Sequence, residues 1–171
     1  MDLQALQSEL KRLNLDAINS HIGVDQMEDQ FDFVSRLGCS YIIAPAASFY
    51  DKESAEKYAE QLNGLGKKAA SYGLKVGFHN HLSEFYKDQG KCLMDYVIEN
   101  SDPETVTFEL DAGWAYAAGV DPLAYIKKNP VMWKAIKRYK TKLPNQMSRP
   151  KSSSTWSTAT TSCTPGRTFR S

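Results

Sequence analysis

Hydrophobic residues recur along the first 140 residues at spacings that alternate between those of helices and those of strands. Residues 2–13 carry a leucine at every third or fourth position, which is typical of an amphipathic helix. Compact apolar runs next to glycine or proline are typical of buried strands. The pattern predicts helices over 2–13, 25–37, 51–72, 91–99 and 121–139, the last interrupted at Pro130, and strands over 15–22, 39–45, 74–81 and 104–111.

The four predicted strands alternate with helices, and this order predicts a parallel α/β sheet with right-handed crossovers. The chain has 171 residues, of which 42% are hydrophobic, so it has enough apolar residues for a core. A complete eight-stranded α/β barrel needs about 200 residues or more and is not expected. Because the first predicted element is a helix with no strand before it, the succession is typical of an excerpt from a larger α/β fold.

Three of the predicted strands place polar side chains on one face and apolar side chains on the other. In the strand over 74–81, His79 and His81 share the face opposite Phe78. Parallel strands that are buried on both sides are usually apolar on both faces. A barrel explains the difference, because polar residues at the carboxyl ends of barrel strands line the mouth where active sites lie. The polar faces of the other two strands carry Asn19, His21, Glu109 and Asp111.

All three histidines of the chain, His21, His79 and His81, lie at such strand ends. A single histidine is more often a hydrogen-bonded structural residue than a ligand, but the shared placement of three favours a site. Glu84 lies just past the strand of His79 and His81, and Asp111 ends the next strand, so these four side chains are candidates to converge on one divalent cation. Imidazole and carboxylate ligands suit Mn²⁺, Zn²⁺, Fe²⁺ or Co²⁺.

Two segments resemble a known family. GFHNHLSEF at 77–85 and ELDAGWAYAAGVDP at 109–122 are similar to the paired segments of the sugar phosphate isomerase/epimerase family, the xylose isomerase-like TIM barrels. The upstream segments NSHIGVD and LGCSYIIAP resemble the second and third strands of that family. The resemblance covers about residues 1–140 and implies an α/β domain that is a partial (β/α)8 TIM barrel, with about four parallel strands and outer helices.

The resemblance also implies an activity, namely metal-assisted proton transfer on a sugar or polyol through an enediolate. A divalent metal (Mn, Zn, Co, Fe or Mg) would be held by Glu84, Asp111 and His81, and Glu84 or His79 would act on the proton. The residues implied as substrate contacts are His21, His81 and Trp114. Trp114 and Tyr116 have two interpretations, either an apolar wall over a ligand or packing at the top of the barrel.

The sequence departs from the family pattern at both ends. A family member would continue after Tyr139 with a strand that carries a metal-ligating histidine, and it would have a strand before the helix over 2–13. Whether this chain is an enzyme therefore stays open. The alternatives are a non-catalytic barrel fragment and an inosose dehydratase-like lyase, which begins with the same proton removal.

Charge divides the chain at Asp121, its last acidic residue. The part through Asp121 carries 20 acidic and 10 basic residues, and the part after it carries 11 basic and no acidic residues, although the net charge is +1. Residues 148–171 hold 13 Ser or Thr among 24. We expect a basic, disordered tail over 141–171, which has three interpretations: a linker, a nucleic-acid arm, or sequence foreign to the fold.

The remaining expectations concern location and partners. No apolar run approaches the ~18 residues of a membrane span, and the start of the chain lacks the apolar core of a signal peptide. We expect a cytoplasmic protein that contacts no membrane. The acidic charge of residues 1–121 argues against nucleic-acid binding, including the cleavage of damaged DNA. Four strands with two unpaired edges predict self-association.

Overall fold

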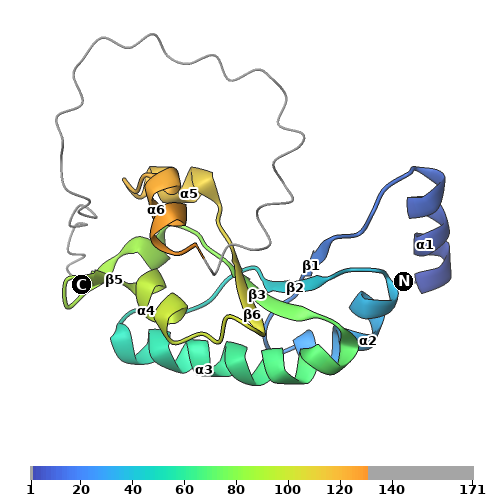
Figure 1. Ribbon diagram of the computed structural model, residues 1–171, viewed down its shortest axis with the longest axis horizontal. Helices are drawn as coiled ribbons and strands as arrows, with labels where there is room; N and C mark the ends of the chain where they lie inside the picture. The colour runs from blue at the N-terminus through green and yellow to red at the C-terminus, as the bar shows by residue number, and fades with distance from the viewer. Residues whose placement is uncertain (1, 131–171) are drawn as a thin grey trace, which may run out of the picture.

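A computed structural model of the chain describes residues 2–130 (Figure 1). Its centre is a sheet of four strands in the order β1-β2-β3-β6, and each neighbouring pair is parallel. The strands are β1 (Asn19–His21), β2 (Tyr41–Ala44), β3 (Lys75–His79) and β6 (Val106–Glu109). The prediction of a partial barrel with four parallel strands is confirmed.

Helices connect and cover these strands, and the longest helix, α3, runs along one side of the sheet (Figure 1). The α-helices are α1 (Leu3–Arg12), α2 (Met27–Arg36), α3 (Lys52–Ala69), α4 (Leu93–Glu99), α5 (Ala112–Ala117) and α6 (Pro122–Lys128). Shorter elements are the 3-10 helices η1 (Ala70–Tyr72) and η2 (Ser83–Phe85) and the antiparallel pair β4 (Lys87–Asp88) and β5 (Lys91–Cys92). Within residues 2–130, no helix is both long and apolar enough to cross a membrane.

Some element boundaries differ from the prediction. The first strand is shorter than predicted, and the start of the predicted helix over 91–99 is taken by β5. Helix α5 was not predicted at all, because its six residues are too few to display a helical period. Helix α6 ends at Lys128, which agrees with the predicted interruption of this helix at Pro130. The rest of the helix predicted over 121–139, and the tail over 141–171, lie outside the described residues.

The core lies between the sheet and its helices. Val76 and Phe78 of β3 are fully buried on the helix side, and Val106 and Phe108 of β6 lie beside them in register. The ring of Phe78 contacts Tyr58 of α3 edge to face, with ring centroids 5.2 Å apart. The alternation that the sequence predicts for these two strands is therefore present in the fold.

Gly77 occupies the opposite, concave face of β3, between Ile43 of β2 and Thr107 of β6. A Cβ at position 77 would lie 2.3 Å from Cδ1 of Ile43 and 3.2 Å from Cγ2 of Thr107. No side chain fits there unless its neighbours move. Glycine at position 77 thus lets the side chains of Ile43 and Thr107 pack closely over β3.

Gly77→Ala is expected to lower the free energy of unfolding by about 1–3 kcal/mol, because an added methyl group overpacks the concave face. Gly64→Ala is the matched control, since a Cβ at position 64 of α3 would have no atom within 4 Å. That change should leave stability unchanged or raise it by up to ~1 kcal/mol, because alanine favours helix. Urea denaturation followed by circular dichroism measures both. Equal stabilities for the two variants would contradict the crowding at Gly77.

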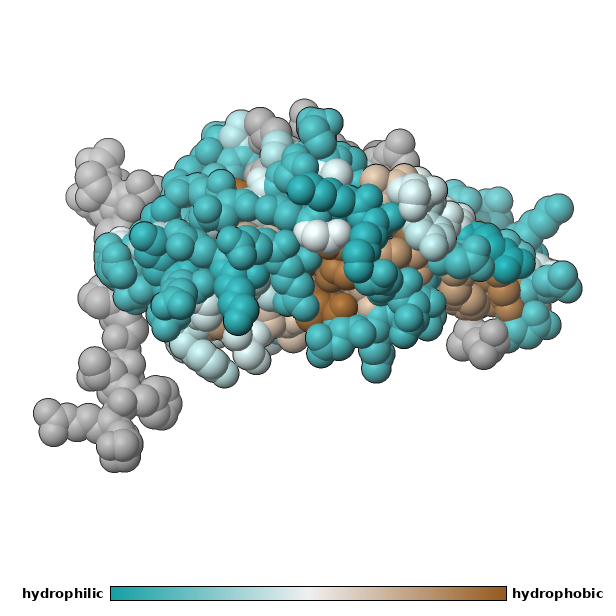
Figure 2. Space-filling view, turned by 90° about the horizontal axis from the view of Figure 1, so that it is seen from below, coloured by the Kyte–Doolittle hydropathy of each residue, from teal (hydrophilic) through white to brown (hydrophobic). Residues whose placement is uncertain are grey.

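The outer strands β1 and β6 have no further strand on their outer edges within residues 2–130. In the segment between α1 and β1, Leu13 and Leu15 are 48% and 55% exposed. Apolar surface is also visible among the hydrophilic residues when the molecule is seen from below (Figure 2). We expect the chain to self-associate, because unpaired edges and exposed apolar groups favour contacts between copies. Size-exclusion chromatography with light scattering should show mass rising with concentration, whereas a stable monomer would contradict this.

Candidate functional site

Polar side chains gather where β1, β3 and β6 end. His21 ends β1 and Glu109 ends β6, so the two residues belong to the outer strands of the sheet. Nevertheless, Nε2 of His21 lies 2.9 Å from Oε2 of Glu109. Two strands lie between them in the sheet, and only a strongly curved sheet brings their side chains together. Asn19 adds a longer contact of 3.5 Å from its Nδ2 to the same oxygen.

The three histidines form a continuous row that ends on a tryptophan. The ring centroids of His21 and His79 are 5.4 Å apart, and those of His79 and His81 are 4.9 Å apart. His81 lies 5.6 Å from the ring of Trp114 in α5. The structure therefore brings together four of the residues that the sequence marks as candidates. Trp114 and Tyr116 are 42% and 78% exposed.

Asp111 follows β6 and uses its two carboxylate oxygens differently. Oδ1 accepts hydrogen bonds from the backbone N–H groups of Gly113 (2.8 Å) and Trp114 (3.0 Å), which makes Asp111 the N-cap of α5. Oδ2 lies 4.0 Å from Nε2 of His79. One oxygen therefore fixes the helix, while the other faces the histidine row.

Glu84 lies in η2 and is 2% exposed. Its Oε2 accepts a hydrogen bond of 2.9 Å from the backbone N–H of His81. Burial and the charge of Glu84 hold the pKa of Tyr58 above its ordinary value, and the Tyr58 hydroxyl has no hydrogen-bond partner among the described residues. Glu84 thus supports the backbone of His81 from within, and its role as a base or ligand stays a prediction.

His79 sits in the middle of the row, between the rings of His21 and His81. Burial lowers its pKa, and the charges of His81 and His21 act in the same direction, while Glu109 and Asp111 oppose them. The buried Nδ1 of His79 has no hydrogen-bond partner among residues 2–130. A neutral imidazole is the form that accepts a proton or binds a metal.

Sequence reasoning missed two residues of this site. Glu109 was placed on the polar face but given no role, although its spacing of two from Asp111 is a signal that could have identified it. Asn80 was not considered, because period-two alternation turns it away from the histidines. In the structure Asn80 is fully buried and hydrogen-bonded to the backbone of Asp111.

The donors at this site suit a divalent cation in their chemistry. They combine imidazole with carboxylate, and they include an orphaned ring nitrogen on His79. As the side chains are placed, no three His, Cys, Asp or Glu residues within the described part of the chain stand close enough to hold a metal ion. The residues thus fit a cation by type, and binding one requires side-chain rotation.

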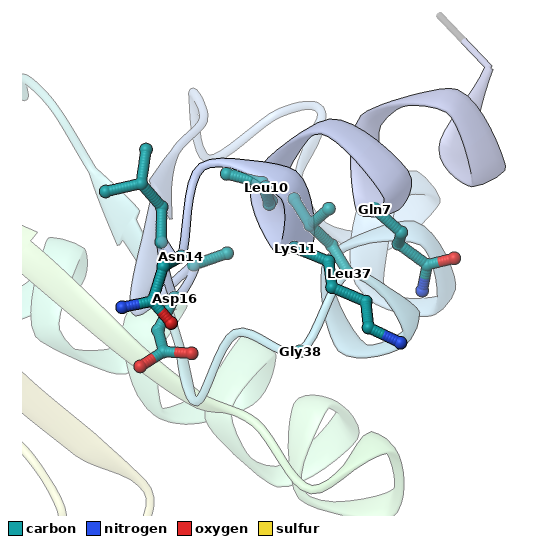
Figure 3. Close-up of a pocket in the computed structure, with 9 residues that line it drawn as sticks. Gln7, Leu10, Lys11, Asn14, Asp16, Leu37 and Gly38 are labelled. Carbon is teal, nitrogen blue, oxygen red and sulfur yellow. The ribbon is translucent and has the colours of Figure 1, made fainter.

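A separate surface cavity of about 360 Å³ lies away from this site, at the amino-terminal ends of the strands (Figure 3). Gln7, Leu10 and Lys11 of α1 line it together with Leu37, which lies just after α2. This cavity contains none of the residues that the sequence marks as candidates.

Comparisons with known proteins agree with this fold. The family model of the xylose isomerase-like TIM barrel matches residues 4–143. The chain is 33% identical to the inosose dehydratase of Salmonella agona over 91 residues, which make up 53% of this chain and 29% of that protein. The chain thus spans less than a third of that relative.

Two solved structures show the same fold at low sequence identity. A sugar phosphate isomerase/epimerase from Parabacteroides distasonis matches with a TM-score of 0.70 and 20% identity, covering 77% of this chain and 60% of that one. The IOLI protein, whose structure holds a zinc atom, matches with a TM-score of 0.59 and 13% identity, covering 78% and 54%. The family resemblance predicted from the two sequence segments is confirmed.

Proposed function

The chain belongs to the xylose isomerase-like TIM barrel family, and from this premise we propose that it carries a site for metal-assisted proton transfer on a small sugar or polyol. The observation that carries the proposal is the row of His21, His79 and His81 beside Asp111 at the carboxyl ends of the strands. Barrel enzymes place their catalytic groups at this end. The metal-binding residues in the proposal are His81, Asp111 and Glu84.

The contacts of Asp111 and His79 support the role that the proposal gives to each. A divalent cation, when bound, supplies positive charge that stabilises a developing oxyanion. Oδ2 of Asp111 is the carboxylate oxygen that capping leaves available to a cation. His79, whose pKa is lowered by burial, accepts the proton beside the carbonyl, with Glu84 as the alternative base.

The proposed substrate contacts lie at the two ends of the histidine row. His21 is held by Glu109 through its Nε2. Because the carboxylate can only accept, the proposal assigns the other ring nitrogen of His21 to a substrate hydroxyl. At the other end of the row, the half-exposed Trp114 lies beside His81. In the proposal, a hydroxyl of a small polar ligand donates a hydrogen bond to His21, and an apolar C–H face of the ligand contacts the indole of Trp114.

Dehydration of a keto-polyol is the second candidate function, because curated relatives at up to 33% identity carry the name inosose dehydratase. This reaction begins with the same proton removal and continues with loss of hydroxide. The same residues would act in its first step. The two functions therefore differ only after the proton has left.

Deuterium exchange tests the proposal. The chain is incubated with ketoses and keto-inositols in D₂O with added Mn²⁺, and the C–H signals beside the carbonyl are followed by NMR. We expect metal-dependent loss of these signals for at least one compound, and loss of the exchange in His79→Gln. A dehydrated product would favour the second candidate. Absence of exchange for every compound would contradict both candidates and favour a non-catalytic fragment.

A further inference from the structure

Asn80 joins the two strand ends that carry the site. Its side chain is fully buried. Its Oδ1 accepts the backbone N–H of Asp111 at 2.9 Å, and its Nδ2 lies 3.4 Å from the carbonyl oxygens of both Asp111 and His81. One amide therefore contacts the backbones of the proposed metal ligands on either side.

Asn80 lies just past the point where the pairing of β3 with β6 ends. The backbone pairing of β3 with β6 ends at the pair His79 and Glu109. Beyond that pair the chain enters η2 after β3 and α5 after β6. The side chain of Asn80 continues the pairing past the end of the ladder, with an acceptor and a donor in the places of a backbone C=O and N–H.

We propose that Asn80 is a positioning residue that sets the separation between His81 and Asp111. The inference rests on the proposed function, because it concerns the same site. An amide is needed here, since only Asn and Gln offer an acceptor and two donors on one side chain. Removal of the amide leaves the partly buried Asp111 N–H without its partner, so the end of β6 should shift or open.

The chain offers a matched control in Asn63 of α3. Its Oδ1 accepts the backbone N–H of Asp102 at 2.7 Å, and its Nδ2 donates to the carbonyl oxygen of Asn100 at 2.8 Å. Asn63 thus makes the same kind of tie, but to the loop that precedes β6. Asn63 is only partly buried, so Asn63→Ala tests whether the loss of such a tie away from the site changes the site.

The experiment compares Asn80→Ala with Asn63→Ala in metal-free protein. In Asn80→Ala we expect the amide of Asp111 to exchange hydrogen at least about tenfold faster, because it loses its buried acceptor. The nuclear Overhauser contact between the rings of His81 and Trp114 should weaken in the same variant. Asn63→Ala should leave both signals as they are. Unchanged exchange and an unchanged ring contact in Asn80→Ala would overturn the inference.

A Mn²⁺ titration then separates positioning from general stability. Asn80→Ala should weaken Mn²⁺ binding by about 10–100-fold, as is usual when a partner of a metal ligand is lost, while Asn63→Ala should not. If the unmodified chain binds no Mn²⁺, the proposed function fails, and the exchange and ring signals still decide the role of Asn80. If Asn80→Ala does not fold, Asn80→Asp is used instead. This variant keeps the acceptor for Asp111 but lacks the Nδ2 donor, so only the contact between the rings of His81 and Trp114 should weaken. An intact ring contact would overturn the inference.

Discussion

Phe78→Ala is expected to lower the free energy of unfolding by about 3–5 kcal/mol, the usual cost of removing a buried aromatic ring. Phe78 is fully buried in β3, and its ring lies 5.2 Å from Tyr58 and 5.9 Å from Phe49. Its loss opens a cavity between the sheet and α3. Because whole domains are stable by only about 5–15 kcal/mol, this change is a large fraction of the total. Urea denaturation monitored by circular dichroism measures it.

Tyr50→Ala is the control for this prediction, because Tyr50 is also aromatic but is 82% exposed. Its replacement should change stability by no more than about 0.5 kcal/mol. A loss of similar size in both variants would show that Phe78 does not lie in the core that we describe.

Asp111→Ala is expected to reduce Mn²⁺ or Zn²⁺ affinity by more than about 100-fold, because it removes a charged donor from the cation rather than a partner of one. The same change removes the N-cap of α5 and should cost about 1 kcal/mol of stability. Calorimetric titration measures the first effect, and urea denaturation measures the second.

Asp121→Ala separates the two effects. Asp121 caps α6 as Asp111 caps α5, since its Oδ1 accepts the backbone N–H groups of Leu123 (2.9 Å) and Ala124 (3.3 Å). This variant should lose about 1 kcal/mol of stability and keep its metal affinity. Equal affinities in the two variants would mean that Asp111 is only a helix cap.

Alternation along the strands predicted most of the fold and the residues at its polar edge. Phe78 and His79 are neighbours in sequence, and their placement on opposite faces of β3 follows from the geometry of any strand. The gathering of His21 with His79 and His81 could be expected because parallel strands end on the same side of a sheet. The family resemblance then identified the sheet as part of a barrel.

The remaining features depend on distances that a linear pattern does not contain. The contact of His21 with Glu109 requires a sheet curved enough to bring its outer strands together. The orientation of Glu84 toward the backbone of His81 depends on the turn of η2, which has no periodic signal. Asn80 links β3 and β6 just past the end of their pairing. Local sequence does not indicate where that pairing ends.

The central claim is that the carboxyl ends of these strands form a divalent-metal site, and calorimetric titration of the unmodified chain with Mn²⁺ and with Zn²⁺ tests it most directly. We predict saturable binding of one ion per chain in the micromolar range for at least one of the two metals. No saturable heat with either metal, in protein that is shown to be folded, would contradict the claim.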